Sequence, residues 1–356
     1  MNYPFLKQEL YNLLQVGTVI PAHPLALTID RKLDEEKQRR LTRYYIESGA
    51  GGVAVGVHTT QFEIRKPEYN LLEPVLRMAA EEIDQSGKSG SFLRVAGITG
   101  NTETAIKEAA LAVKYNYHVG LISNGGLKEL SENALIERAK RVAEKIPLFG
   151  FYLQPAAGGR LLSYDFWKKF AEIPNVVAIK IAAFNRYQTI DVVRAVCESS
   201  RPHEIALYTG NDDNIVADLI TPYRFMVNGK QVEKRFVGGL LGHWAVWTSK
   251  AIELLERIKS GQMSHEELLA HGIAATDMNA VIFDAKHNFH GCIPGIHEIL
   301  RRQGLLDGRW CLDPAEELSP GQDQEIDRIV RDYRSYTDDE FARSFLQKDK
   351  LKYSNA

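Results

Sequence analysis

The chain has 356 residues, of which 44% are hydrophobic and 25% are charged, and its 44 Lys and Arg residues nearly balance its 46 Asp and Glu residues. This is the composition of a globular protein, and the balanced charge provides no cationic field that would favour nucleic acid as a partner. No run approaches the roughly 18 apolar residues needed to cross a bilayer, so a membrane partner is not expected either.

Between residues 18 and 261, short apolar runs rich in β-branched residues alternate about eight times with longer amphipathic runs. The strand-like runs are 18–22, 52–57, 92–98, 118–123, 148–154, 176–182, 204–209 and 235–241. Helix-like segments lie between them, for example at 34–48, 102–115 and 131–146. The strand-like runs are almost continuously apolar, as in Val176-Val177-Ala178-Ile179, which is typical of parallel strands buried on both faces.

Residues with helix-capping propensity support these helix boundaries. Thr102 and Ser131 stand where N-caps are expected, and Gly49 stands where the first of these helices should end. Alternating β and α units predict a parallel sheet, and about eight units over roughly 245 residues predict a closed (β/α)₈ TIM barrel. A doubly wound open sheet is the alternative.

Two segments depart from the repeat. Residues 221–234 carry Asn228-Gly229 between β-favouring residues, which predicts a type I′ hairpin inserted before the last strand. Residues 262–356 contain no strand-like run and predict helices near 265–283, 295–303, 320–335 and 338–350. We therefore predict a barrel domain over 1–261 and a C-terminal helical extension over 262–356 that packs on the barrel.

In a TIM barrel the active site is formed by the loops at the carboxyl ends of the strands, so polar residues at those ends are the candidates. They are His23, His58, Thr59, Thr60, Asn124, Tyr152, Gln154, Lys180, Asn211, Asp212 and His243. Among these, Lys180 stands inside an apolar strand and must be either desolvated or directed into a cavity. Burial lowers the pKa of an ammonium group, and a neutral amine can attack a carbonyl to form a Schiff base.

The alternative for Lys180 is a solvated amine on a stem that lies along apolar surface. Tyr152 ends the preceding strand-like run. A phenol there can transfer protons, although a core tyrosine with a bonded hydroxyl is also compatible with this position.

Several segments resemble one family of class I aldolases. Residues 175–180 (NVVAIK) resemble the Schiff-base strand N-[IV]-[IV]-G-I-K, and residues 151–155 (FYLQP) resemble the Tyr-Asn-x-Pro segment, of the dihydrodipicolinate synthase / N-acetylneuraminate lyase family. Tyr152 and Lys180 have the separation that the family shows between its tyrosine and lysine. Weaker likeness continues in 209–213 (TGNDD), 239–242 (GLLG) and 293–295 (IPG), so the resemblance covers roughly residues 15–335.

The resemblance implies a lyase or aldolase that makes or breaks a carbon–carbon bond. Lys180 would form a Schiff base with the keto carbon of a 2-oxo acid such as pyruvate, and Tyr152 would relay protons. Gly210 and Leu241 would supply backbone carbonyls near the substrate. The other partner would be an aldehyde, no metal or other cofactor is implied, and family members are commonly homo-oligomers, dimers or tetramers.

Four further residues are predicted to bind substrate. His58 and Thr59 lie in the loop whose amides hold the substrate carboxylate in the family, and Gln154 and Asn211 stand at strand ends. This loop departs from the family pattern, because Val57 and His58 replace a Thr pair. His58 could bind the carboxylate or transfer protons near neutral pH.

Two more departures concern the synthases of this family. Ser123-Asn124 replace a Pro-Tyr-Tyr segment that lends a tyrosine to the neighbouring subunit, and Ala157 replaces an arginine, with Arg160 three residues later. These differences argue against true dihydrodipicolinate synthase activity and suit a different, bulkier aldehyde.

Two other functions remain as alternatives. His23, His58 and His243 could approach one another as ligands of a metal-dependent barrel hydrolase. The departures at Val57 and Ser123 also suit a catalytically inactive barrel that binds a sugar acid. A second possible ligand set, Asp284, His287 and His290, has a spacing that favours an exposed polar helix surface instead.

The expected location is the cytoplasm. The first residues lack the basic and then apolar order of a secretory signal. The three cysteines, Cys197, Cys292 and Cys311, are odd in number and far apart, which argues against a disulfide framework and suits a reducing compartment.

Overall fold

A parallel eight-stranded barrel organises the computed structural model, which describes residues 3–353. The strands are β1 (Val19–Pro21), β2 (Gly52–Val55), β3 (Leu93–Ile98), β4 (Val119–Ile122), β5 (Leu148–Leu153), β6 (Val176–Ala182), β7 (Ala206–Thr209) and β10 (Phe236–Leu241). Their order in the sheet is β1-β10-β7-β6-β5-β4-β3-β2, and a parallel bridge between Ala22 and Ala54 links the segments at its two ends. The predicted TIM barrel is confirmed, and the open doubly wound sheet is wrong.

Helices follow the strands in alternation and then continue without strands to the end of the described chain. They are α1 (Gln8–Val16), α2 (Glu35–Glu47), α3 (Leu72–Gln85), α4 (Thr102–Lys114), α5 (Glu132–Ala143), α6 (Tyr164–Ala171), α7 (Arg186–Cys197), α8 (Ile215–Ile220), α9 (Thr248–Ser260), α10 (His265–Ile282), α11 (Cys292–Arg302), α12 (Gln322–Asp332) and α13 (Asp339–Tyr353). The four helices predicted after residue 262 are therefore present, and residues 262–353 contain no strand.

The ends of the helices follow the predicted cap residues with one exception. The Ser131 side chain accepts a hydrogen bond from the Ala134 amide at the start of α5, and Gly49 has a φ of 92° just after α2. At α4 the cap is Asn101, whose side chain accepts from the Thr104 amide, so the prediction of Thr102 is wrong by one position. Both residue types cap helices, and only the backbone geometry distinguishes them.

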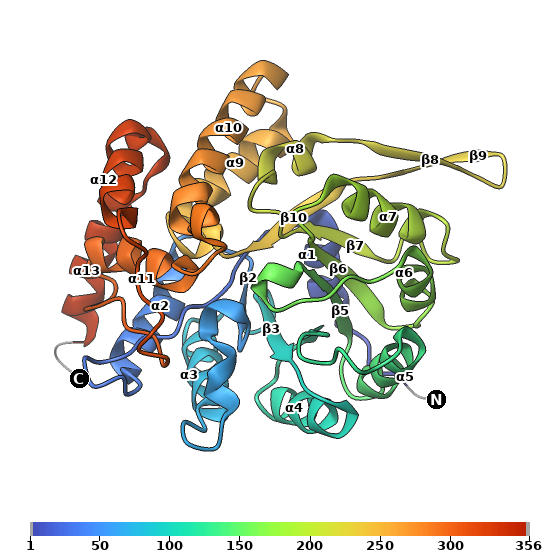
Figure 1. Cartoon of the computed structure of the whole chain (residues 1–356), viewed down its shortest axis with the longest axis horizontal. Helices are drawn as coiled ribbons and strands as arrows, with labels where there is room; N and C mark the ends of the chain where they lie inside the picture. The colour runs from blue at the N-terminus through green and yellow to red at the C-terminus, as the bar shows by residue number, and fades with distance from the viewer. Residues whose placement is uncertain (1–2, 354–356) are drawn as a thin grey trace. The chain divides into compact units, whose positions relative to one another are not determined.

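The predicted hairpin is confirmed. β8 (Tyr223–Val227) pairs antiparallel with β9 (Lys230–Lys234), and Val227 faces Lys230 across the turn. Asn228 and Gly229 both have positive φ, 49° and 77°, as a type I′ turn requires. Figure 1 shows the hairpin projecting past α7, against which its base packs.

The chain divides into two compact units. Residues 3–18 and 93–240 form one, and residues 19–92 and 241–353 form the other. This division cuts the chain at other points than residue 261, so the predicted boundary between a barrel domain and an extension stays a prediction. Among residues 3–353, no helix is long and apolar enough to cross a membrane.

Candidate active site

Lys180 lies in β6 with its side chain on the face of the sheet opposite α6, and it is 8% exposed. Its ammonium nitrogen stands 4.5 Å from the centroid of the Phe151 ring on β5. Burial lowers the pKa of Lys180 to about 8, while the carboxylate of Asp212 opposes this shift. The amine is therefore buried rather than solvated, and its neutral form is easier to reach near neutral pH than that of an ordinary lysine.

Gly210 provides the space that the lysine side chain occupies. A Cβ atom at position 210 would lie 2.5 Å from Lys180 Cε and 2.9 Å from Ala182 Cβ. The Gly210 amide donates to the Ile181 carbonyl at 2.7 Å, so this backbone cannot move away easily. The structure thus brings Gly210 and Lys180 together, and it explains the glycine by packing.

Tyr152 does not lie beside Lys180. Its ring packs on Trp167 of α6 at a centroid distance of 5.3 Å, and its hydroxyl stands 3.4 Å from both the nitrogen and the oxygen of the Leu162 backbone. Burial raises the pKa of Tyr152. The expectation that this phenol reaches the lysine is therefore wrong.

A register shift between β5 and β6 explains why Phe151, and not Tyr152, lies opposite Lys180. Leu148 pairs with Val176, but the next residue, Phe149, pairs with Ala178, so Val177 is an extra residue in β6. Without that shift the partner of Lys180 would be Tyr152; with it the partner is Phe151. Successive side chains of a strand point to opposite faces, so a one-residue shift exchanges the phenol for a phenyl ring.

The Asn211 side chain is committed to the structure of two adjacent loops. It is 2% exposed, its Oδ1 accepts from the Phe184 amide at 3.0 Å, and its Nδ2 donates to Thr189 Oγ1 and to Asp218 Oδ2 at 3.2 and 2.9 Å. These bonds hold the segments after β6 and β7, on either side of Lys180. We therefore assign Asn211 a positioning role, instead of the direct substrate contact expected from the sequence.

Arg160 joins the loop after β5 to the loop after β4. Its Nη1 donates to the carbonyls of Leu127 and Leu130 at 2.7 and 3.0 Å. The same two loops approach so closely at Gly125 that a Cβ there would lie 2.6 Å from the Gly158 carbonyl oxygen. Arg160 is thus held by the backbone. Gln154, at the start of the loop after β5, is 9% exposed, and its backbone N–H donates to the Ala182 carbonyl.

Sequence reasoning missed two residues near this end of the sheet. Phe151 carries no signal of its own in the sequence, because the residue with the family spacing is its neighbour Tyr152. Arg138 of α5 is 1% exposed and donates to the Gly100 carbonyl and, at 3.3 Å, to Asn124 Oδ1, while its Nη2 has no partner among the described residues. Its position on the apolar face of the segment 131–146 was a signal for a buried guanidinium.

The other predicted site residues belong to the second unit. His58 begins a short 3₁₀ turn (His58–Thr60) and is half-buried against Phe62, with a ring-centroid distance of 5.9 Å. The hydroxyls of Thr59 and Thr60 both donate to the His23 carbonyl, at 3.2 and 2.7 Å. These threonine hydroxyls therefore hold the loop to the end of β1.

The carbonyl of Leu241, expected near the substrate, accepts a hydrogen bond from the Ala22 amide at 3.2 Å. A carbonyl has two lone pairs, so this sheet contact leaves one acceptor position.

The structure does not gather the histidines of the alternative metal site as ligands. His23 is fully buried, with Nδ1 2.8 Å from the Pro24 carbonyl oxygen and Nε2 2.9 Å from Thr42 Oγ1. Burial lowers the pKa of His23 and of His243 to about 4. Across residues 3–353, no group of three or more His, Cys, Asp and Glu side chains has an arrangement that could hold a metal ion.

Asp284 is not part of an exposed helix surface, so that prediction is wrong. It is 3% exposed, and its carboxylate accepts hydrogen bonds from the Gly291 amide at 3.0 Å and from Ser319 Oγ at 2.5 Å. The same carboxylate lies 2.5 Å from His287 Nδ1. With a φ of 55°, Asp284 follows the end of α10 and begins the turn that leads to α11. Its spacing to the histidines reflects this turn.

Comparison with known proteins gives a consistent family likeness. Residues 15–224 match the model of the Dihydrodipicolinate synthetase family. N-acetylneuraminate lyase 2 of Escherichia coli O6:H1 (strain CFT073) is 23% identical over 316 residues, which cover 88% of this chain and 92% of the relative. The 4-hydroxy-tetrahydrodipicolinate synthase of Thiobacillus denitrificans is 29% identical over 185 residues, covering 51% of this chain and 58% of the relative.

Solved structures show the same fold. A dihydrodipicolinate synthase from Oceanobacillus iheyensis superposes with a TM-score of 0.72 at 19% identity, and the superposition covers 91% of this chain and 99% of the synthase chain. An N-acetylneuraminate lyase from Fusobacterium nucleatum gives a TM-score of 0.70 at 16% identity, with 91% and 100% covered. At these identities the likeness supports the fold alone.

Proposed function

Because this chain belongs to the dihydrodipicolinate synthetase family, we propose that it is a lyase or aldolase that forms a Schiff base between Lys180 and a 2-oxo acid. The family model and the curated relatives place it among class I aldolases and lyases. The observation that supports the finer proposal is the desolvated amine of Lys180, whose pKa burial lowers to about 8. Burial of this kind is what a Schiff-base lysine requires, because only the neutral amine attacks a carbonyl.

The proposed reaction begins with addition of the Lys180 amine to the keto carbon of a pyruvate-like acid. Loss of water gives an iminium, which draws electrons from the neighbouring carbon and allows that carbon to lose a proton. The resulting enamine adds to the carbonyl of an aldehyde, and hydrolysis of the new iminium releases the product and the lysine. Cleavage follows the same steps in reverse.

The proton relay requires a group other than Tyr152. Tyr152 packs on α6, and the residue facing the amine is Phe151, which has no proton to transfer. The carboxylate of Asp212 is the charged group that acts on Lys180, where it favours the ammonium form. The roles of His58, Thr59 and the backbone carbonyls of Gly210 and Leu241 in holding the substrate are proposed from the family resemblance.

The remaining proposals concern substrate size, assembly and location. The changes at Val57, Ser123 and Ala157 favour an aldehyde other than that of the synthases. A homo-oligomer, dimer or tetramer, is proposed from the family, and a cytoplasmic location is proposed from the odd number and wide spacing of the cysteines.

Borohydride trapping tests the proposal. Enzyme incubated with pyruvate and borohydride should gain the mass of the reduced adduct at Lys180, as mapped on peptides, and Lys180→Ala should gain none. Lys234 is an internal control, because burial lowers its pKa to about 8 as well while its amine donates to the Ile205 carbonyl. Equal labelling of both lysines, or no adduct with any of several 2-oxo acids, would refute the proposal; binding of a sugar acid without any adduct would favour the inactive barrel.

A further inference from the structure

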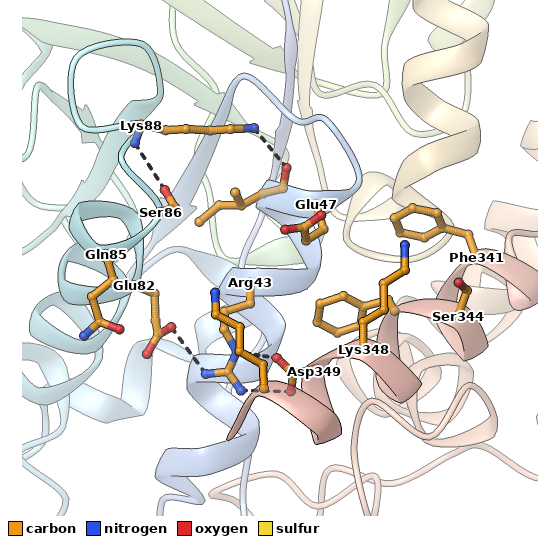
Figure 2. A pocket seen from close by; sticks show the side chains of 13 residues that line it. Arg43, Glu47, Glu82, Gln85, Ser86, Lys88, Phe341, Ser344, Lys348 and Asp349 are labelled. Atoms are coloured by element: carbon orange, nitrogen blue, oxygen red, sulfur yellow. Dashed lines mark hydrogen bonds and ion pairs between the residues drawn. The ribbon is translucent and has the colours of Figure 1, made fainter. Parts of the chain in front are cut away.

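One cavity is lined by none of the predicted active-site residues. It has a volume of about 320 Å³ and is bounded by α2, by α3 with the loop that follows it, and by α13 (Figure 2). All of its lining residues belong to the unit formed by 19–92 and 241–353. Its volume is within the range of sites that hold small molecules.

The base of this cavity is a closed network of ion pairs. Arg43 donates to both carboxylate oxygens of Asp349, at 2.6 and 3.0 Å, and to Glu82 at 3.3 Å. Both carboxylates are nearly fully buried, and Arg40 and Arg39 bind them from the other side. The negative charges at the base are therefore already neutralised and leave no acceptor for a cationic ligand.

The rim carries two exposed lysines, Lys88 and Lys348, together with the carboxylate of Glu47. Among residues 3–353, neither Lys88 nor Lys348 forms an ion pair, and the Lys88 amine has only a 3.4 Å contact to the Ile46 carbonyl. Lys352 lines the same cavity. Figure 2 shows the Lys348 side chain extending toward the Phe341 ring, and Glu47 lines the same cavity.

Three apolar side chains also line this cavity. Phe345 and Ile46 are each 5% exposed, and with Phe341 they form an apolar side next to the lysines. A ligand that satisfies both features needs one anionic group for the ammonium groups and an apolar body for the rings. Glu47 would repel a polyphosphate, so a single negative charge fits best.

We propose that this cavity binds a small organic monoanion with an apolar body, such as an aryl-substituted carboxylate. Its carboxylate would lie between Lys88, after α3, and Lys348, on α13, and its apolar part against the phenylalanine rings. Such a ligand would bridge the C-terminal helix and the α3 segment, and it would stabilise the folded unit by an amount that grows with the logarithm of its concentration once it exceeds Kd.

Calorimetry and thermal unfolding with 3-phenylpropionate as the probe test this proposal. The probe should bind the wild-type enzyme and Lys180→Ala alike and raise the melting temperature of both, whereas phosphate and ATP at matched ionic strength should not. Lys348→Glu should weaken binding at least tenfold. The matched control is Lys350→Glu, an exposed neighbour on α13 that does not line the cavity, and it should change affinity less than twofold.

Equal loss of affinity in the two variants would mean a general charge effect and would overturn the proposal. So would stabilisation by phosphate as strong as that by the probe, or loss of probe binding in Lys180→Ala. These results are independent of borohydride trapping, so the two proposals can fail separately.

Discussion

Lys180 on β6 faces Phe151 on β5, with its ammonium nitrogen 4.5 Å from the ring centroid, while Tyr152 turns to the helix α6. The extra residue Val177 produces this pairing by shifting the register of the two strands by one position. An aromatic face near a desolvated ammonium partly stabilises its charge, but it cannot carry a proton. The assignment of the proton relay therefore depends on this register.

Moving a phenol hydroxyl from position 152 to position 151 should show whether Tyr152 takes part in proton transfer. We expect Tyr152→Phe to keep the rate of Schiff-base trapping within about twofold and to lower the free energy of unfolding by no more than about 1 kcal/mol, because the hydroxyl bonds only to the Leu162 backbone. Phe151→Tyr, which adds a phenol beside the amine, should speed the exchange of pyruvate methyl protons with deuterium by about an order of magnitude. A collapse of trapping in Tyr152→Phe would contradict the observed register.

Gly210→Ala should displace the reactive amine. The added methyl group would lie 2.5 Å from Lys180 Cε, so the lysine side chain must move or the strand must shift. We expect at least a tenfold loss of trapping rate and a loss of about 1–3 kcal/mol in the free energy of unfolding, measured by denaturant titration. Gly90→Ala is the control, since no atom lies within 4 Å of a Cβ at that position; similar losses in both variants would rule out the packing argument.

The charge of Lys180 should make stability depend on pH. Its pKa is lowered from 10.5 to about 8 by burial, so at pH 7 the folded protein holds a desolvated ammonium and Lys180→Met should raise the melting temperature. Between pH 8 and 10.5 the unfolded chain binds more protons than the folded one, so the stability of the wild type rises with pH in this window. The advantage of Lys180→Met should shrink from pH 8 to pH 10. An advantage that stays constant over this range would contradict a buried titrating amine.

Arg160→Ala should loosen two loops together. The guanidinium joins the loop after β5 to the carbonyls of Leu127 and Leu130, so its removal leaves those carbonyls without this donor. Hydrogen exchange should accelerate in both 123–131 and 154–163, as read by mass spectrometry. Arg141→Ala, which removes an exposed ion pair with Glu103, should leave both segments unchanged; faster exchange in only one loop would show that Arg160 does not couple them.

Local patterns in the sequence were sufficient for the architecture. The eight apolar runs became the eight barrel strands, Asn228-Gly229 became the type I′ turn, and the helices after residue 262 lie close to their predicted bounds. The placement of Lys180 in a strand also followed from its apolar neighbours. Periodicity, turn chemistry and capping act over a few residues, so they are readable in the chain itself.

The orientation and partners of the polar side chains were decided only in the tertiary structure. Tyr152 matched a spacing along the chain, but the register shift at Val177 places Phe151 opposite Lys180, and Tyr152 packs on Trp167. Asp284 matched a surface pattern, but it is buried and bonded to Ser319 and Gly291. The hydroxyl of Thr59, a residue expected near substrate, and the guanidinium of Arg160 likewise bond to backbone carbonyls. Which face a side chain takes depends on strand register, and which bond it makes depends on residues far along the chain, so neither is determined by the local sequence.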